Sequence, residues 1–254
     1  MNKIFSFTLI LVLIVSCSDA PLLIEKKSAD QHAISDCDNK PCPQISVDYI
    51  LYTGEKEVIT PINDKIIAFI VGSLYLGDPA VEPKITSVDG AIGQFVKDYW
   101  RDTSEFPDIH EYEAEVSIEE TFRSKDFVSV ALSQYSYIGG AHGNGTLDYV
   151  NFDIETGEII TIEQLVKDKK SLMVLAEEKL REAYDLPENE RLNSTMFWFK
   201  DDAFHLSDCI GFEKGKMVIH YNQYEIASYA DGPIDIEFSL EEVASFLAFS
   251  TDKK

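Results

Sequence analysis

Residues 127–154 read FVSVALSQYSYIGGAHGNGTLDYVNFDI, with an apolar run on each side of a loop that holds four glycines. On both sides of the loop the apolar residues follow the two-residue period of a β-strand. Glycine permits the tight turns and close backbone approaches that a short connection between strands requires. The stretch therefore predicts two long antiparallel strands joined by a bulged, tightly packed loop at 139–145.

This loop lacks the features of a phosphate-binding loop. A phosphate loop leads into a helix, whose free N–H groups and dipole meet the anion. A Walker loop also has Lys and then Ser or Thr after its last glycine. Here Gly145 is followed by Thr146, Leu147 and Asp148, which begin a strand. The sequence thus excludes both kinds of nucleotide site.

His142 is the loop residue whose side chain could take part in catalysis. A histidine acts as a general base when a nucleophile or a carboxylate lies beside it, yet the chain has no serine elbow, HExxH or HxxxH motif. His205 and His220 lie in no ligand-like cluster. We interpret His142 as a structural residue bonded to carbonyls under the loop, and we predict no catalytic residue, metal or cofactor. The alternative is a cell-wall-modifying hydrolase that uses His142 as its base.

In the remaining sequence, segments with the two-residue period of strands and segments with the period of helices are segregated into blocks. Strands are predicted at 45–51, 112–122, 158–162, 209–213, 217–222 and 234–238, and helices at 61–76, 88–102, 162–185 and from 239 onward. Antiparallel hairpins dominate, and there is no βαβ alternation. We expect an α+β fold with antiparallel sheets, helices packed on one face, and two intimately joined subdomains at 42–150 and 151–250.

The first 41 residues predict export and anchoring. An apolar run from Ile4 to Val15 is too short for a membrane span of roughly 20 residues but fits a signal peptide at 1–16. The run ends in a lipobox-like sequence whose Cys17 would become the lipidated N-terminus. Residues 17–41 are polar without a period, which predicts a tether. We expect a lipoprotein of the cell envelope, in the outer membrane if the cell has two, with the lipid as its only membrane contact.

The net charge restricts the partner. The chain has 22 Lys and Arg against 45 Asp and Glu, a formal charge of −23. Nucleic-acid binding depends on clustered Lys and Arg, so a nucleic-acid partner is excluded. Charge complementarity favours a cationic partner. The alternative is that the acids only keep an exported protein in solution.

Besides Cys17, the chain has Cys37, Cys42 and Cys209. In an oxidising compartment Cys37 and Cys42 could close a small loop, or either could pair with Cys209. The spacing is not that of a redox CxxC motif. The sequence leaves the pairing open and predicts a structural disulfide or a free thiol.

Two stretches resemble a bacterial extracytoplasmic family that carries paired DUF4163 and DUF3298 domains. The first is YSYIGGAHGNGTLDYVNFDIETGEIITIEQL (135–165), and the second is MVIHYNQYEIASYADGPIDIEF (217–238). The resemblance extends over about 42–250, but only these two stretches are specific to the family.

The resemblance implies an α+β fold and an envelope location. Members of the family include the lysozyme-binding extracellular part of an anti-sigma factor and the N-terminal portion of a peptidoglycan deacetylase. This chain shows neither a membrane helix after residue 17 nor an appended deacetylase domain, so we expect the binding module without its effector. Its partner would be a basic protein such as lysozyme. The candidate ligand-binding residues are Tyr135, Tyr137, Gly139, Gly140, His142, Tyr224 and Tyr229.

Overall fold

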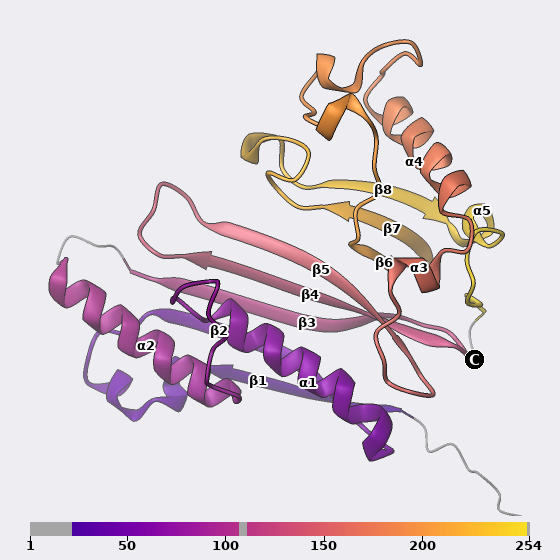
Figure 1. Cartoon of the computed structure of the whole chain (residues 1–254). Helices are drawn as coiled ribbons and strands as arrows, with labels where there is room; N and C mark the ends of the chain where they lie inside the picture. Colours follow the sequence, from indigo (N-terminus) through magenta and orange to yellow (C-terminus); the bar gives the residue numbers. More distant parts are fainter. Residues whose placement is uncertain (1–21, 107–110, 253–254) are drawn as a thin grey trace, which may run out of the picture.

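The computed structural model describes residues 22–106 and 111–252, which form two sheets and the helices packed on them (Figure 1). The predicted signal peptide and Cys17 lie outside the described residues. The α+β class expected from the sequence is confirmed. None of the helices in the described ranges is long and apolar enough to cross a bilayer.

The N-terminal unit is a five-stranded sheet in the order β1-β2-β3-β4-β5. Its strands are β1 (Leu23–Asp30), β2 (Gln44–Thr53), β3 (Glu113–Arg123), β4 (Phe127–Tyr137) and β5 (Asn144–Asp153). The predicted antiparallel pair on either side of the glycine loop is β4 and β5. All neighbouring strands are antiparallel except β2 and β3, which run parallel. The prediction of antiparallel pairing was therefore wrong for β2 and β3, which are connected by two helices.

β1 corrects the expected tether at 17–41. This strand pairs antiparallel with β2 along its whole length. This strand was not predicted, because most of β1 is exposed and the strand has no apolar face. Main-chain hydrogen bonds to β2 hold it in place, so the ordered unit begins about 20 residues before Cys42.

Two helices, α1 (Lys56–Ser73) and α2 (Val88–Glu105), cover one face of this sheet (Figure 1). In α1 the fully buried Ile62, Ile66 and Ile70 recur every four residues, which places them on one face of the helix. The expected start at Pro61 was wrong. The helix begins one turn earlier, and Pro61 lies inside it at the loss of one intrahelical hydrogen bond.

The Cys37–Cys42 pairing, one of the three that the sequence left open, is present as a disulfide. Cys209 is a free, buried thiol far along the chain. The disulfide closes the loop between β1 and β2, next to the helix-covered core, to which both cysteines contribute partly buried side chains. Its place favours a structural role.

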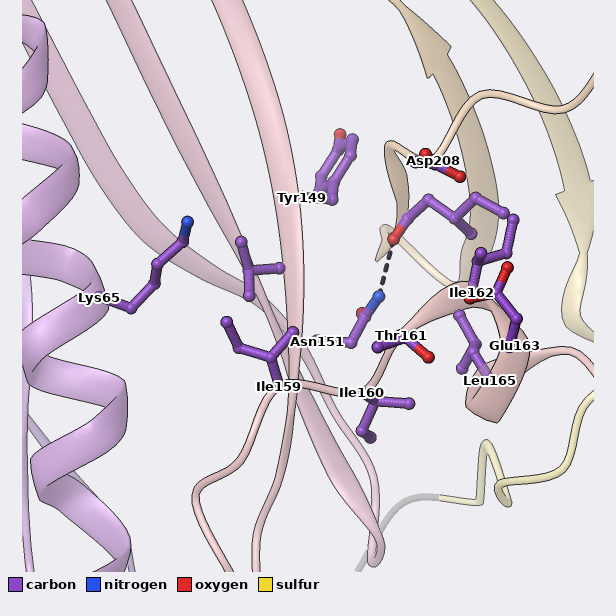
Figure 2. Close-up of a pocket in the computed structure, with 12 residues that line it drawn as sticks. Lys65, Tyr149, Asn151, Ile159, Ile160, Thr161, Ile162, Glu163, Leu165 and Asp208 are labelled. Atoms are coloured by element: carbon purple, nitrogen blue, oxygen red, sulfur yellow. Dashed lines mark hydrogen bonds between the residues drawn. The ribbon is translucent and has the colours of Figure 1, made fainter. Parts of the chain in front are cut away.

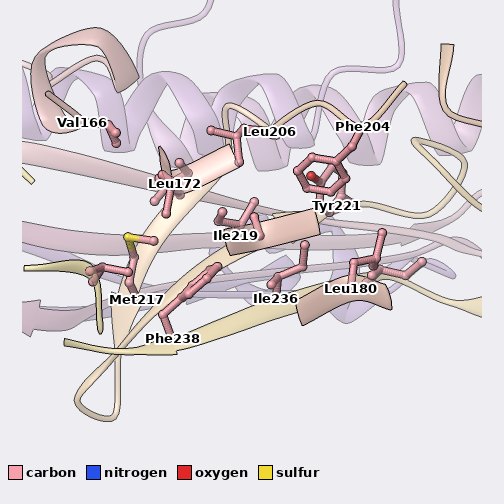
Figure 3. Packing of buried hydrophobic residues seen from close by; sticks show 14 of the residues in the cluster. Val166, Leu172, Leu180, Phe204, Leu206, Met217, Ile219, Tyr221, Ile236 and Phe238 are labelled. Atoms are coloured by element: carbon pink, nitrogen blue, oxygen red, sulfur yellow. The ribbon is translucent and has the colours of Figure 1, made fainter. Parts of the chain in front are cut away.

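The C-terminal unit is a three-stranded antiparallel sheet of β6 (Ile210–Glu213), β7 (Lys216–Tyr221) and β8 (Ile234–Ser239). The predicted hairpin across Lys214 and Gly215 is confirmed. α4 (Lys169–Ala183) buries Leu172 and Leu180 against the β7 and β8 side chains (Figure 3). A short α5 (Leu240–Val243) follows β8 and starts with the predicted capping box of Ser239 and Glu242.

The single helix expected at 162–185 is in fact two helices. A four-residue α3 (Ile162–Leu165), with the expected Thr161–Gln164 capping box, ends before α4. The break arises because Val166 forms a bridge with Leu247, and the Lys167 N–H donates to the carbonyl of Phe246. The strand expected at 158–162 is also wrong: only Ile159 forms a bridge, to Phe152.

The two units meet where β6 packs on β3, β4 and β5. Residues 127–132 of β4 are buried on both faces, because one face meets α1 and α2 and the other meets the C-terminal unit. Gly211 of β6 lies against the Tyr149 ring so closely that a Cβ there would be 2.0 Å from the Tyr149 Cγ. Phe212 is fixed on both sides, since its N–H donates to Ser129 Oγ at 3.0 Å and its carbonyl accepts from Thr121 Oγ1 at 2.7 Å. The expected intimate joining of two subdomains agrees with this packing.

Candidate functional site

The glycine loop connects β4 to β5 and leads into a strand, as expected. Gly139 has a φ of 84°, which is the left-handed conformation that glycine favours. Gly140 does not need that conformation and is exposed at the tip. These two residues shape the turn and contribute main chain rather than side chains to the surface.

Gly143 is the point on which three side chains of the candidate site converge. Its carbonyl accepts a hydrogen bond from Tyr229 Oη at 3.0 Å and another from His142 Nδ1 at 2.8 Å. A Cβ at this position would lie 2.2 Å from Tyr135 Oη, so only glycine fits under that ring. Tyr229 comes from the C-terminal unit, so the loop of one unit is bonded to a loop of the other.

His142 and Tyr224, which are exposed, and Tyr229, which is half-buried, form a group of rings that we call the aromatic patch. The His142 and Tyr229 rings stack with centroids 3.9 Å apart, and Tyr224 lies 5.7 Å from Tyr229. Since the Gly143 carbonyl can only accept, the bonded His142 nitrogen carries a proton, and the other nitrogen lies 3.5 Å from Tyr224 Oη. Tyr224 is 53% exposed. The patch therefore offers ring faces and edges to solvent without a buried reactive group.

The backbone of Tyr224 is strained. Its φ is 69°, in the left-handed region that a bulky residue seldom adopts. The conformation is held by a turn in which the Tyr224 N–H donates to the Ala227 carbonyl and the Glu225 N–H donates to Asn222. Strain of this kind costs about 1–3 kcal/mol and is often found at functional sites. Here it turns a large ring out of the protein toward solvent.

Trp198 extends the exposed aromatic surface next to the patch. Its indole is 45% exposed and its Nε1–H donates to the Glu225 carbonyl at 3.3 Å. The Trp198 main-chain N–H donates to the carbonyl of Ile226. Glu225 and Asp231 are exposed on the same loop and give it negative charge. Sequence analysis missed Trp198; the run of aromatics at 197–199 was the available signal.

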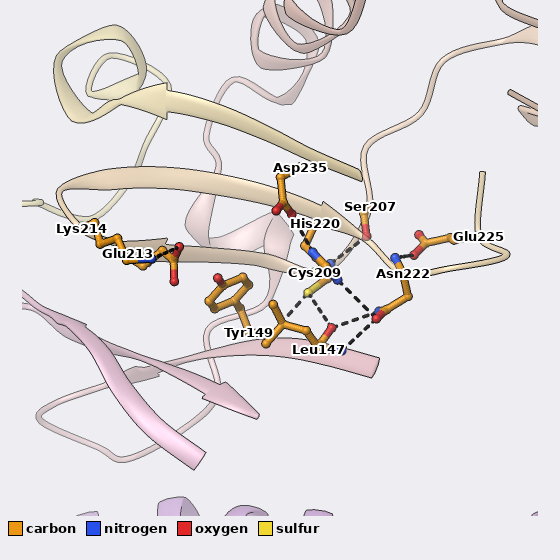
Figure 4. Close-up of polar contacts among 10 residues, drawn as sticks. All are labelled: Leu147, Tyr149, Ser207, Cys209, Glu213, Lys214, His220, Asn222, Glu225 and Asp235. Atoms are coloured by element: carbon orange, nitrogen blue, oxygen red, sulfur yellow. Dashed lines mark hydrogen bonds and ion pairs between the residues drawn. The ribbon is translucent and has the colours of Figure 1, made fainter. Parts of the chain in front are cut away.

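A polar network surrounds the buried His220 and Cys209 (Figure 4). Asn222 closes the edge of β5, because its Oδ1 accepts from the Leu147 N–H at 2.8 Å and its Nδ2 donates to the Leu147 carbonyl at 3.0 Å. His220 Nε2 lies 3.3 Å from the same Asn222 oxygen, and His220 Nδ1 lies 2.6 Å from Asp235. The network therefore fixes the start of the loop that carries Tyr224 and Tyr229.

Cys209 belongs to this network, and its thiol is expected to be unreactive. Its sulfur accepts from the Tyr149 N–H at 3.3 Å and lies 3.5 Å from the Leu147 carbonyl. Burial raises the pKa of the Cys209 thiol to about 12. Although His220 and Asp235 are near, both ring nitrogens of His220 already have partners, and a neutral thiol is a poor nucleophile. The geometry favours an architectural role for all three.

The structure thus brings together Tyr135, His142, Tyr224 and Tyr229 from the predicted set. Tyr137 is half-buried at the end of β4 and forms no ring contact or side-chain hydrogen bond with the other described residues of the patch. Gly143 and Asn222 were not predicted as site residues, because their contacts are with residues about 80 positions away along the chain. Within 22–106 and 111–252, no three His, Cys, Asp or Glu side chains are grouped as metal ligands would be.

Two family models match the chain. Residues 37–145 match the model described as Deacetylase PdaC, and residues 158–241 match DUF3298, a family of unknown function. The resemblance to DUF3298 proteins is therefore confirmed, while the DUF4163 assignment of the first half stays a prediction. No curated protein matches the sequence.

Solved structures share the fold. A DUF3298 family member from Bacteroides fragilis has a TM-score of 0.69 and 18% identity, over 92% of this chain and 96% of that chain. A DUF3298 family protein from Pseudomonas aeruginosa has a TM-score of 0.59 and 16% identity, over 93% of this chain and 99% of that chain. At such identities the likeness shows a common architecture and carries no ligand with it.

Proposed function

We propose that this chain, which joins a PdaC-like segment to a DUF3298 domain, is an extracytoplasmic binding module that recognises a basic protein through its aromatic patch. The two matched families fit a module of the cell envelope. The observation that carries the proposal is the patch itself. His142, from one unit, and Tyr229, from the other, are stacked and both bond to the Gly143 carbonyl, and Tyr224 lies beside Tyr229.

The composition of the patch suits protein recognition. Tyrosine and tryptophan are enriched at the few interface positions that dominate binding energy, because their large rings lose little conformational entropy. Tyr229 is already oriented by its bond to the Gly143 carbonyl, and Tyr224 is fixed by its strained turn. Binding would therefore need little reorganisation of either ring.

The charge indicates the kind of partner. With a formal charge of −23, and with Glu225 and Asp231 exposed beside the rings, the surface attracts cations. A basic protein such as a lysozyme-like muramidase would gain association rate from this field and affinity from the rings. The lipobox-like sequence before Cys17 supports anchoring by a lipid, which would hold the patch close to the envelope surface.

A calorimetric titration with lysozyme at two ionic strengths tests this proposal. We expect binding at low salt that weakens at moderate salt, and a loss of about tenfold or more in affinity for Tyr229→Ala. Phe106→Ala is the matched control, since Phe106 is an exposed aromatic at the end of α2 with no contact to the patch. Absence of binding at low salt would remove lysozyme as the partner. Equal losses in both variants would remove the patch as the contact surface.

The first matching family model is that of a deacetylase. Among the described residues, no side-chain contact indicates a catalytic role in deacetylation. The hydrolase alternative based on His142 has one point in its favour, namely that the imidazole is exposed. However, its two ring nitrogens face the Gly143 carbonyl and Tyr224 rather than a carboxylate. Binding without catalysis is therefore the function that we propose.

A further inference from the structure

A cavity lies at the junction, lined by residues of α1, β5, the 159–165 segment and the start of β6 (Figure 2). Its volume is about 320 Å³. Pockets that take small molecules typically measure roughly 300–1,000 Å³, so this one has room for a ligand of one or two amino-acid residues. None of the residues of the aromatic patch lines it.

Asn151 provides an unpartnered acceptor in the wall of this cavity. The residue is 5% exposed, and its Nδ2 donates to the Ile210 carbonyl at 2.7 Å. That bond fixes the orientation of the amide, and the other amide atom, Oδ1, is buried without a hydrogen-bond partner. It is the one such side-chain atom found in the described residues. Buried polar atoms are almost always bonded, so an oxygen left open in a cavity wall indicates that a donor from outside completes it.

The main chain of β5 adds a second feature to the same wall. β5 is an edge strand, and its outward groups are closed at several points: Asn222 binds Leu147, Cys209 accepts from the Tyr149 N–H, and the Ile160 N–H donates to the Asn151 carbonyl. Between these closures lie the outward Tyr149 carbonyl and the outward Asn151 N–H, since both groups of alternate residues face away from the paired strand. This acceptor and this donor, two positions apart on the edge strand, could both form hydrogen bonds with the main chain of an extended peptide.

The rim supplies apolar and charged contacts. Ile159 is 44% exposed and stands beside buried Ile160, which gives an aliphatic surface at the mouth. Lys65 extends from α1 on the opposite side of β5 (Figure 2) and forms no ion pair with a described residue. Glu163 and Asp208 also line the cavity, on the side away from Lys65 (Figure 2), so a carboxylate suits only the Lys65 side.

We propose that this cavity binds the carboxyl-terminal end of a short peptide. A peptide N–H donates to Asn151 Oδ1, an aliphatic side chain packs on Ile159 and Ile160, and the terminal carboxylate pairs with Lys65. This site shares no residue with the aromatic patch, so its test does not depend on the proposed function.

The test uses the tripeptide Ala-Val-Ala and the same peptide with an amidated C-terminus. In NMR titrations of the ¹⁵N-labelled protein, the acid should shift the Asn151 side-chain and Ile159 main-chain signals at millimolar peptide, and the amide should bind about threefold more weakly, as expected for loss of an exposed ion pair. Lys65→Ala should bring the acid down to the affinity of the amide. Lys56→Ala, an exposed lysine at the start of the same helix, should leave the affinity unchanged.

A second variant blocks the cavity. Ile159→Trp fills the mouth from a half-exposed position and should lower affinity at least about tenfold, with folding checked from its thermal midpoint. The proposal is overturned if millimolar acid leaves the Asn151 signals unmoved, if acid and amide bind equally to the unmodified protein, or if a folded Ile159→Trp variant binds as well as the parent. A crystal structure soaked in the acid that shows only water on Asn151 Oδ1 would also overturn it.

Discussion

His142 and His220 occupy opposite environments on the same junction. His220 is 3% exposed, and its ring nitrogens lie 2.6 Å from Asp235 and 3.3 Å from Asn222. His142 is exposed, stacked on Tyr229, and bonded directly to one carbonyl of its own loop. The buried His220 ring is fixed by Asp235 and Asn222, and Asn222 in turn bonds to Leu147 of the N-terminal unit. A histidine with a free ring face can meet a ligand at small cost. The comparison therefore assigns architecture to the network around His220 and recognition to the aromatic patch.

The largest effect should come from removing the buried histidine. His220→Ala leaves Asp235 without its side-chain partner, removes one contact of Asn222 and opens a void, so we expect the free energy of unfolding to fall by about 2–4 kcal/mol. Chemical denaturation measures this. Asp235→Asn keeps an acceptor facing the ring and should cost less. A His220→Ala loss below about 0.5 kcal/mol, the usual range for surface changes, would contradict the assignment.

The packing between β5 and β6 should be nearly as sensitive. Gly211→Ala places a Cβ against the Tyr149 ring, and overpacking of this kind costs about 1–3 kcal/mol of unfolding free energy. Gly72→Ala is the control: nothing lies within 4 Å of that Cβ, and the helix should gain about 0.5–1 kcal/mol. Equal denaturation midpoints for the two variants would show that the units are not tightly packed here.

Alkaline pH should weaken the same junction. The pKa of Cys209 is raised by burial to about 12 from an ordinary value of 9.0, and burial also raises the pKa of Tyr149 and Tyr221. Because the folded pKa of Cys209 is the higher one, its contribution to stability is complete below pH 9 and is lost between pH 9 and pH 12. Urea midpoints should fall over this window, and less steeply for Cys209→Ala. Parallel curves for the two proteins would remove Cys209 from this explanation.

The smallest effect on stability is expected in the loop. His142→Gln should change the free energy of unfolding by less than about 0.5 kcal/mol, since the ring is exposed and a glutamine amide can still donate to the Gly143 carbonyl. It should weaken lysozyme binding, because the stacked ring on Tyr229 is lost. If the variant instead abolished a wall-hydrolysing activity at unchanged stability, the catalytic alternative for His142 would be correct.

The sequence predicted the long strands and the glycine loop because their two-residue period and their turn residues are local. It missed β1, whose hydrogen bonds to β2 leave no apolar pattern, and the parallel pairing of β2 with β3, which depends on the path of two helices. The family resemblance selected Tyr224 and Tyr229 together with His142, but not how they meet. Their contact depends on Gly143 and Asn222, whose partners lie 86 and 75 residues away along the chain.

Tyr224→Gly tests the central claim most directly, because it separates the patch from the fold. Glycine suits a φ of 69°, so the strain is relieved while the exposed ring is removed. Thermal unfolding and lysozyme calorimetry on the same sample should show an equal or higher midpoint together with an affinity about tenfold lower. A variant that binds lysozyme as well as the parent does, at an unchanged or higher midpoint, would contradict the assignment of recognition to the aromatic patch.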